Sequence, residues 1–533
     1  SYPHSWRSRK PIIYRATPQW FIRMDGENRI REKALQALGD VTFVPAQARN
    51  RLTSMVADRP DWCISRQRAW GVPIAVFVNK QTGEVLRDAA VMDRIVEAFR
   101  VDGADAWYDS DPSRFLGNEY NAADFEQVFD VVDVWFESGS THSFVLNQPG
   151  LRFPADLYLE GSDQHRGWFQ SSLLESVGTR GVAPYKTLVT NGFVLDEQGR
   201  KMSKSLGNVI APQDVNDSLG ADILRLWVMN SDTNDDLRIG KEILKQQGEL
   251  YRRLRNTLRW LLGALDGYTD AEAVPYEELP ELEKWVLHRL TEFDAMMRQA
   301  VETHEWVGVY PALHGFCTTD LSAFYFDVRK DAIYCDAPDS LRRRAARTVL
   351  DVLHRCLATW LAPVLVFTAD DAWTARFGKD SSVHLEAFPV VPEEWDDPEL
   401  GDRWTTLRAV RRIITTEIET ARRSGQIGSS LQAAIELPVY EDKVALFDGV
   451  DWADLAIVSQ AEFSIIPEEA PQPENGAGVP CGVPVVSVAD GEKCVRCWKV
   501  LPEVGQNAAY PTLCVRCADV VAGGLSRSSA TGH

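Results

Sequence analysis

The sequence predicts a multidomain protein: an α/β region, then an all-α bundle, then a small α+β junction and a four-cysteine tail. Three observations lead to this prediction. Strand-like and helix-like segments alternate over residues 61–235, which favours a parallel sheet. Apolar residues then recur with the 3.6-residue period of helices over residues 240–425. Short strand patterns return over residues 426–490, and two Cys-x2-Cys pairs follow.

The composition is that of a folded protein. The chain has 533 residues, 45% of them hydrophobic and 25% charged, with a formal net charge of −20. This excludes a disordered protein, and the length predicts about three or four domains. The longest apolar stretch, residues 356–369, contains Pro363 and is too short to span a bilayer, so we interpret it as a buried helix. The acidic balance argues against a nucleic-acid partner, but net charge averages over domains whereas binding is local.

The cysteines and the N-terminal sequence indicate the compartment and the extent of the chain. Of nine cysteines, Cys317, Cys335 and Cys356 lie in aromatic-rich helical sequence, which favours reduced thiols in the cytoplasm. No apolar signal-peptide run follows Ser1. Residues 11–16 read as a strand. A chain that begins inside a folded element suggests a fragment of a longer protein, with a trimmed complete protein as the alternative.

In the α/β region, residues 129–136 are rich in β-forming residues, and residues 156–160 read as a strand that stops at Gly161. Helical spacing follows from Asp163, with Gly178 as the C-terminal stop. Further expected elements are strands at 188–190 and 193–195, and helices at 212–220 and 222–229.

The next region reads as a helical bundle, with helix faces at 243–261, from 285, at 321–333 and at 349–366. Two of its helices carry arginine clusters that could track phosphates, with a solvated helix face as the alternative. The clusters are Arg252, Arg253, Arg255 and Arg259, and Arg342, Arg343, Arg344 and Arg347. A Pro/Glu-rich linker, residues 466–480, precedes the tail.

The tail has the spacing of a four-thiolate zinc site. Cys494 and Cys497 form one Cys-x2-Cys turn, and Cys514 and Cys517 form the second. About 24 residues cannot bury a useful core, so the metal would supply the folding free energy. Four thiolates leave no open position for water, which makes the site structural. Disulfides or idle thiols are the alternatives.

The tail is also locally basic. Residues 491–533 carry about +2 within a chain of −20, which makes phosphate contact plausible, with a solvated basic surface as the alternative. The residues concerned are Arg496, Lys499, Arg516 and Arg527, with Trp498.

A lysine loop, residues 201–205, follows a strand run and the turn at 196–199. Lys201 and Lys204 could gather around a polyphosphate, because lysine is a mobile point charge. Alone, such a string would be read as a solvated loop. It stands, however, just before the helix that begins at Pro212, where ligands of open sheets bind.

Lys-Met-Ser-Lys-Ser resembles the second signature of class I aminoacyl-tRNA synthetases. The segments 61–71, 133–142, 159–170 and 191–194 look like isoleucyl-tRNA synthetase of the bacterial type, and the tail resembles its C-terminal zinc module. The resemblance runs from residue 1 to residue 533. None of the nine histidines starts the family's first signature, His-x-Gly-His, and most of the editing domain is missing. The chain therefore resembles the C-terminal portion of the family.

The resemblance implies five segments. They are a remnant of the editing insertion (1–24), the second half of a Rossmann-like catalytic domain with the lysine loop (25–240), a helical anticodon-binding domain (241–425), a junction and linker (426–490) and the zinc module (491–533).

It also implies residue roles. Glu160 would hold the ammonium group of isoleucine, Asp163 and Gln164 would hydrogen-bond nearby, Trp135 and Trp168 would wall the side-chain pocket, Phe193 and Val194 would line the adenine side, and Lys201 and Lys204 would stabilise charge on the phosphates. Ordinary core packing is the alternative for the two tryptophans.

The activity implied is that of an isoleucine–tRNA ligase, which uses ATP and Mg²⁺ to activate L-isoleucine, releases pyrophosphate and charges tRNA-Ile. A structural Zn²⁺, a monomer and no membrane partner are also implied. We expect the chain alone to be inactive, because half of the ATP site is missing. One alternative is a non-catalytic tRNA-binding protein made of the bundle and the zinc module. Another comes from the tail alone, since similar modules occur in formamidopyrimidine-type DNA glycosylases.

Overall fold

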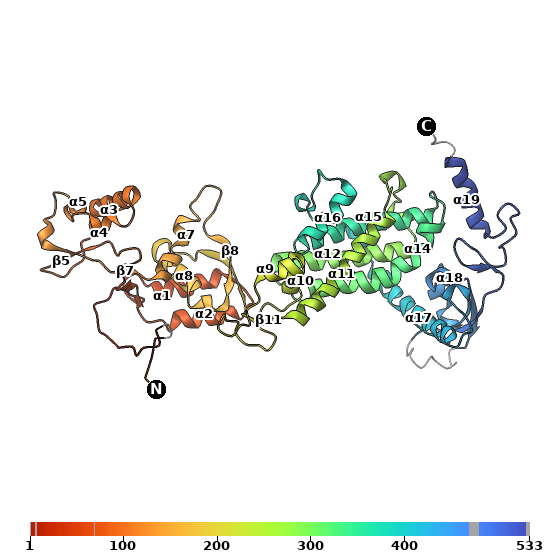
Figure 1. Ribbon diagram of the computed structural model, residues 1–533, viewed down its shortest axis with the longest axis horizontal. Coiled ribbons are helices and arrows are strands. Elements are labelled where there is room, and N and C mark those ends of the chain that lie inside the picture. Colours follow the sequence, from red (N-terminus) through yellow and green to blue (C-terminus); the bar gives the residue numbers. More distant parts are fainter. Residues whose placement is uncertain (1, 6–7, 69, 468–478, 529–533) are drawn as a thin grey trace. The chain divides into compact units, whose positions relative to one another are not determined.

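The structure, a computed structural model, describes residues 2–5, 8–68, 70–467 and 479–528 (Figure 1). The chain forms two compact units, residues 1–194 with 233–237 and residues 195–232 with 238–533. It passes between them at β10 (Val194–Leu195) and β11 (Leu237–Arg238). Most of the predicted linker, residues 468–478, lies outside the described residues. No helix in the described ranges is both long and apolar enough to cross a membrane.

The first unit contains short strands and mostly short helices. Its helices are α1 (Ile30–Ala37), α2 (Ala48–Ala57), α3 (Ala89–Asp102), α4 (Ala106–Asp109), α5 (Ser113–Leu116), α6 (Val134–Gly139), α7 (Thr141–Phe144) and α8 (Trp168–Arg180). Its strands are β1 (Phe21–Ile22), β2 (Thr42–Val44), β3 (Trp62–Cys63), β4 (Ser65–Arg66), β5 (Phe77–Asn79), β6 (Phe125–Gln127), β7 (Val131–Val132), β8 (Ala155–Gly161) and β9 (Tyr185–Asn191).

A three-stranded parallel sheet in the order β2-β9-β8 forms the centre of the first unit, as the sequence predicts. Phe43 on β2, Leu188 on β9 and Phe169 on α8 are buried in one core, to which α1 and α2 also contribute. A second, smaller core lies around Trp107 on α4 and Phe115 on α5, beside the antiparallel β5-β6 pair.

Two β predictions for this unit are wrong. Residues 11–16 form no strand, because their pairing stops at a single bridge between Pro11 and His4; Ile13 and Tyr14 are each 82% exposed. Within residues 129–136 only β7 is extended, and α6 begins at Val134. β-forming residues therefore take helical conformation where helix α8 rather than a strand lies beside them.

The predicted stop of α8 is also misplaced. Gly178 lies inside the helix, which continues to Arg180 and ends at Gly181. Gly181 has a φ of 77° and its N–H bonds to the carbonyl of Val177, as a glycine C-cap does. Both glycines fit the sequence pattern, and only the one with positive φ ends the helix.

The second unit is mainly helical. Its helices are α9 (Pro212–Ser218), α10 (Ala221–Met229), α11 (Lys241–Ala264), α12 (Glu281–Thr303), α13 (Val309–Gly315), α14 (Phe326–Cys335), α15 (Leu341–Leu361), α16 (Val366–Phe377), α17 (Pro398–Arg423), α18 (Trp452–Leu455) and α19 (Val515–Ser528). Its strands are β12 (Ala433–Tyr440), β13 (Gln460–Ile466), β14 (Val485–Val488), β15 (Glu492–Lys493) and β16 (Val500–Leu501).

Helices α11, α12 and α15 lie side by side, as Figure 1 shows, and they form a bundle with α14 and α17. The three-stranded sheet β13-β12-β14 of the junction shares the bundle's hydrophobic core: Leu437 on β12 is as fully buried as Leu290 on α12. The helix expected over 349–366 is interrupted at residues 362–365, where Pro363 lies. The helix expected over 321–333 is a π-helical stretch, Phe316–Tyr325, followed by α14.

A buried ion pair joins three parts of the second unit. Glu283 on α12 has no exposed side-chain surface, and both its oxygens accept from Arg329 on α14, at 2.6 and 2.8 Å. Tyr325 donates to the same carboxylate at 3.1 Å. The remaining guanidinium nitrogen of Arg329 donates to Asp454 on α18 at 3.0 Å. All these charges are compensated, which is the condition for burying them.

Replacing Arg329 should strongly destabilise the second unit. Arg329→Met leaves the carboxylate of Glu283 buried without a counter-charge, and we expect a loss of about 3–5 kcal/mol in the free energy of unfolding, measured by denaturant titration. Lys330→Met is the matched control, because the exposed pair of Lys330 with Asp327 should contribute less than about 1 kcal/mol. Equal unfolding midpoints for the two variants would contradict the role given to this pair.

Candidate functional site

The candidate substrate site of the first unit lies at the carboxyl edge of its parallel sheet. The register of β8 and β9 pairs Glu160 with Thr190 and Gly161 with Asn191, so both strands end at the same level. Of the predicted substrate-binding residues, Glu160 lies at the end of β8, and Asp163, Gln164, Phe193 and Val194 follow soon after the two strands. Ligands of parallel sheets bind at this edge, because successive strands present their following loops there.

The loop after β8 leaves its carboxylates available to a ligand. Glu160 and Asp163 are exposed. The carboxylate of Glu160 accepts only from the backbone N–H of Gly161 among the described hydrogen bonds. Gln164 donates to Asp163 at 3.1 Å and accepts from the N–H of Trp168 at 3.1 Å. Gln164 therefore fixes the start of α8 relative to this loop.

The two predicted pocket tryptophans both lie near the start of α8. Trp168 stacks on Tyr158 with ring centroids 4.1 Å apart, and its Nε1 donates to the carbonyl of Ser138 on α6 at 3.0 Å. Trp135, also on α6, is 43% exposed. A Cβ on Gly167 would lie 2.8 Å from the ring of Trp135, so only glycine lets this indole lie against the backbone there.

The loop after β9 is held by close backbone contact. The N–H of Gly192 donates to the carbonyl of Thr233 at 3.0 Å, and a Cβ at Gly192 would overlap the backbone of Asp235. The N–H of Phe193 donates to the carboxylate of Asp236 at 2.8 Å. The side chain of Phe193 is 51% exposed and that of Val194 37% exposed, so both apolar surfaces are available.

Lys201 and Lys204 belong to the second unit. Both side chains are exposed, and neither forms an ion pair with the described residues. The loop that carries them runs from the end of β10 to α9. The roles of the lysines and of the substrate residues above stay predictions.

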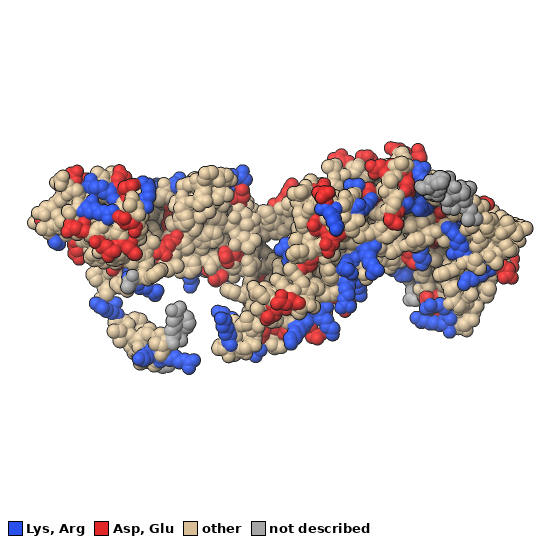
Figure 2. All heavy atoms as spheres, turned by 45° about the horizontal axis from the view of Figure 1, so that its top comes forward, with Lys and Arg blue, Asp and Glu red and all other residues tan. Residues whose placement is uncertain are grey.

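The arginine clusters of the bundle have different surroundings. On α11, Arg253, Arg255 and Arg259 are exposed and form no ion pair within the described ranges, while Arg252 pairs with Glu249. Figure 2 shows basic and acidic side chains distributed over the surface, with basic side chains gathered in patches. The α11 cluster thus remains available for phosphates.

The α15 cluster is wrongly predicted as a phosphate-binding or solvated face, because its arginines contact groups of the protein itself. Their partners are Asp331, Asp336 and Asp454 for Arg342, the Ile333 carbonyl for Arg343, the Glu272 carbonyl for Arg344, and the Glu272 carboxylate for Arg347. Arg347 has only 3% of its side chain exposed.

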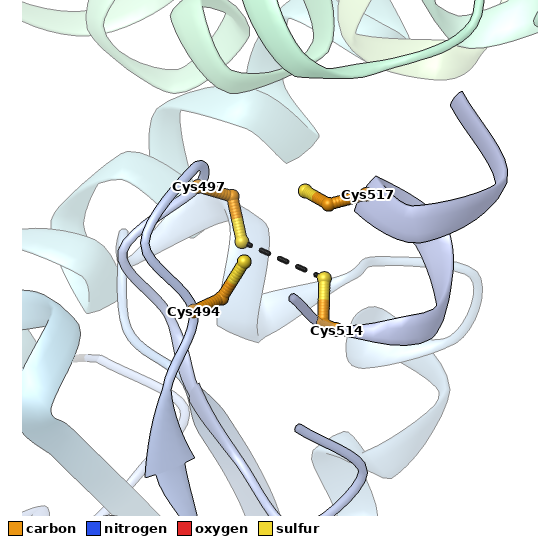
Figure 3. A group of neighbouring side chains, drawn as sticks. All are labelled: Cys494, Cys497, Cys514 and Cys517. Carbon is orange, nitrogen blue, oxygen red and sulfur yellow. Dashed lines mark hydrogen bonds between the residues drawn. The ribbon is translucent and has the colours of Figure 1, made fainter. Parts of the chain in front are cut away.

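The four tail cysteines come together as a zinc site requires (Figure 3). Cys494 and Cys497 lie at the turn between β15 and β16, and Cys514 and Cys517 lie at the start of α19. Their sulfur atoms are all buried and within 4.8 Å of one another. The sulfur atoms of Cys497 and Cys514 are 3.8 Å apart. Zn–S bonds of about 2.3 Å in a tetrahedron place neighbouring sulfur atoms about 3.8 Å apart, so this donor set fits zinc. The same separation excludes a disulfide between Cys497 and Cys514.

Each zinc turn has the sequence Cys-Val-Arg-Cys, and both arginines point to α14 of the bundle. Arg496 donates to the carbonyls of Cys335 and Tyr334 at 2.5 and 3.1 Å. Arg516 pairs with Asp331 and Asp336 at 2.5 and 2.8 Å. Burial tends to raise the pKa of Asp331, but the hydrogen bond and charge of Arg516 outweigh burial and lower it. These two arginines, predicted as phosphate contacts, instead fasten the module to the bundle.

Comparisons with known proteins identify the family. Residues 7–240 match the family described as tRNA synthetases class I (I, L, M and V). The chain is 72% identical to isoleucine–tRNA ligase of Gluconobacter oxydans over 98% of its length and 53% of that protein. The chain belongs to the class I tRNA synthetases. Residues 283–437 match the anticodon-binding domain of tRNA ligases, and residues 491–520 match a zinc finger found in FPG and IleRS.

A further relative within the synthetase family is isoleucine–tRNA ligase of Mesorhizobium japonicum, 50% identical over 98% of the chain and 53% of that protein. The chain thus spans about half the length of the curated relatives it matches. Among solved structures, methionyl-tRNA synthetase of Mycobacterium tuberculosis, in complex with methionyl-adenylate, is similar with a TM-score of 0.50 and 18% identity. The structural match covers 69% of this chain and 65% of the methionyl-tRNA synthetase chain, and it shows the fold alone. The resemblance to isoleucyl-tRNA synthetases is confirmed.

One buried carboxyl of this synthetase chain was missed by sequence reasoning. Glu175 on α8 is 8% exposed, and one of its oxygens has no hydrogen-bond partner among the described residues. It lies against Gly139 of α6, where a Cβ would overlap the carboxyl. Its helical spacing of seven residues from Trp168 is the signal that could have placed it on the inner face.

Glu175 should make the stability of the first unit pH-dependent. Burial raises the pKa of Glu175 from 4.5 to about 8, so between these values the native state holds a proton that the unfolded state has lost. Stability from this group is therefore complete below pH 4.5 and falls as pH rises to about 8, by up to about 1.4 kcal/mol per pH unit. Glu175→Gln should remove this decline, measured as unfolding midpoints from pH 4.5 to 8. A Glu175→Gln variant with the same pH dependence as the unsubstituted protein would contradict this role of Glu175. The control is Glu126→Gln, which changes an exposed carboxylate on β6.

The tail should hold one zinc ion per chain. Cys514→Ser should abolish zinc binding, measured by metal analysis, and lower the thermal midpoint of the second unit, because Arg516 then loses its fixed position. Cys481→Ser, which changes a buried cysteine outside the cluster, should retain the metal. Zinc retained by both variants would show that Cys514 is no ligand.

Proposed function

We propose that this chain forms the part of an isoleucine–tRNA ligase that holds isoleucine, the adenylate and the transfer RNA. The enzyme activates L-isoleucine with ATP, releases pyrophosphate and transfers the aminoacyl group to tRNA-Ile. The observation that carries this proposal is the 72% identity to an isoleucine–tRNA ligase over 98% of the chain. The arrangement of the sheet edge supports it.

On the amino-acid side, Glu160 binds the ammonium group, because its exposed carboxylate stands at the end of β8. Asp163 and Gln164 hydrogen-bond the ligand beside it. Trp135 and Trp168 form the walls of the side-chain pocket. The hydrogen bond from Trp168 to Ser138 supports this role, since it ties α8 to α6 and so fixes one indole relative to the other.

On the nucleotide side, Phe193 and Val194 contact the adenine. Lys201 and Lys204 stabilise negative charge on the phosphates as the isoleucine carboxylate attacks the α-phosphorus and pyrophosphate leaves, with Mg²⁺ bound to the ATP. This catalysis consists of positioning and electrostatic stabilisation, without a covalent intermediate on the protein.

The remaining segments bind and orient the transfer RNA. We propose that residues 25–240 are catalytic, residues 241–425 bind the anticodon region and residues 491–533 form a module held by structural Zn²⁺, with residues 1–24 and 426–490 as connecting parts. The exposed arginines of α11 support contact with the phosphate backbone, and they would serve equally in a non-catalytic tRNA-binding protein. That the protein is a monomer and that it is located in the cytoplasm stay predictions.

The test uses a chimera in which this chain replaces the matching region of the Gluconobacter oxydans enzyme. Lys204→Ala should lower the rate of isoleucine-dependent ATP–pyrophosphate exchange by about 10²–10³-fold, because one charge that stabilises the transition state is lost. The KM for isoleucine should stay unchanged.

Lys245→Ala is the matched control, since Lys245 is an exposed lysine on α11 outside the loop. A chimera without isoleucine-dependent exchange, in parallel with an active parent enzyme, would overturn the proposed function. Exchange that continues at full rate in the Lys204→Ala variant would overturn the role of this lysine.

A further inference from the structure

One buried carboxylate holds together the residues on either side of the lysine loop. We call these flanking residues, 196–200 and 208, the neck of the loop. Asp196 is 5% exposed and lies just after β10. Its Oδ1 accepts from the N–H groups of Gln198 and Arg200, at 3.0 and 2.8 Å, which closes the turn before the lysines. Its Oδ2 accepts from Asn208, beyond the lysines, at 2.9 Å. One side chain therefore joins the two ends of the loop.

Asn208 completes this connection from the far side. Besides donating to Asp196, its amide group donates to the carbonyl of Lys201 at 3.3 Å. Its oxygen accepts from the N–H of Ser203 at 2.9 Å. The asparagine thus uses its donor and its acceptor on both sides of Met202, and it fixes the backbone between the two lysines and the neck.

The tip of the loop is held much less firmly. Apart from the hydrogen bond of the Ser203 N–H to Asn208, the described hydrogen bonds of Ser203, Ser205 and Leu206 are local ones of 3.1 to 3.3 Å with one another. The N–H of Gly207 donates to the carbonyl of Lys204 at 3.3 Å. The lysine side chains are exposed. The loop is therefore a fixed neck with a free tip, which is the arrangement expected when a charged group must follow a phosphate as it leaves.

We propose that Asp196 and Asn208 are positioning residues, which lock the neck of the loop and thereby present Lys201 and Lys204 to the phosphates. The catalytic part of this inference rests on the proposed function, whereas the locking of the neck does not. Asp196 suits the task because it stays ionised: the hydrogen bond from Asn208 and then the N–H of Arg200 hold its pKa well below the usual range.

Amide hydrogen exchange on this chain tests the lock without any substrate. Asp196→Ala and Asn208→Ala should each raise the exchange rate of the N–H groups of residues 200 and 203 by about tenfold or more, since loss of a hydrogen bond to a charged group supports such a factor. Trypsin should cut faster after Lys201 and Lys204. Unchanged exchange and cleavage in both variants would overturn the proposal.

The reciprocal swap separates the lock from a general loss of folding. Asp196→Asn combined with Asn208→Asp keeps a hydrogen bond across the neck with its polarity reversed, and it should restore most of the protection. Asp217→Asn changes an exposed carboxylate on the neighbouring helix α9 and should leave the loop unaffected. Exchange within α11 should be equal in all variants. Protection that the swap fails to restore would argue that the pair does not act as a unit.

The chimeric enzyme tests the consequence for the reaction. Asn208→Ala should raise the KM for ATP and lower the rate of ATP–pyrophosphate exchange about tenfold, while the KM for isoleucine stays unchanged. The double variant Asp196→Asn, Asn208→Asp should recover this rate. Amide exchange can rise in the neck variants while neither Lys204→Ala nor Asn208→Ala changes the rate of ATP–pyrophosphate exchange. In that case the proposed function of the loop fails and the structural role of the neck stands. If Lys204→Ala abolishes exchange but the neck variants behave as wild type, the positioning role fails.

Discussion

The second unit depends on the need to neutralise a carboxylate in its core. Glu283 is completely buried on α12, and Arg329 compensates its charge with two hydrogen bonds. Arg329 also forms an ion pair with Asp454. Arg342 links Asp454 to Asp336, and Arg516 of the zinc module closes the series. Because a buried charge without its partner is costly, each element in this series fixes the place of the next. Bundle, junction and zinc module are thereby joined within one compact unit.

This series explains how an acidic chain can belong to a family that handles nucleic acid. Many of the arginines in the helical unit neutralise internal carboxylates, including Arg342 and Arg347 of α15 and Arg516 of the second zinc turn. Other basic groups stay exposed without an ion pair among the described residues, and they include three arginines on α11 and the two lysines of the loop. Net charge of the whole chain therefore says little about phosphate binding, which depends on which cations have no acidic partner.

In the first unit the constraint is backbone proximity rather than charge. Gly192 lets the loop after β9 touch the backbone of Asp235, and Gly167 lets Trp135 lie against the start of α8. Gly139 leaves room for the carboxyl of Glu175 between α6 and α8. The register of β8 and β9 brings the loops after both strands to one edge of the sheet, and these glycines permit the close contacts around that edge. The site is thus shaped by missing side chains as much as by those present.

The sequence alone determined the order of the regions, the parallel strands β8 and β9 and the four-thiolate cluster, because periodicity and spacing are local properties that survive folding. The family followed from the resemblance of its motifs. It could not decide between Gly178 and Gly181 as the end of α8, nor foresee the helix at Val134, because packing against neighbouring elements settles both. It also assigned Arg342, Arg347, Arg496 and Arg516 to phosphates or solvent. Only the tertiary structure showed their acidic and carbonyl partners, and it likewise paired Asp196 with Asn208. Several of these partners, such as Arg342 with Asp454 and Arg516 with Asp331, lie far apart in the chain, and the fold determines that they meet.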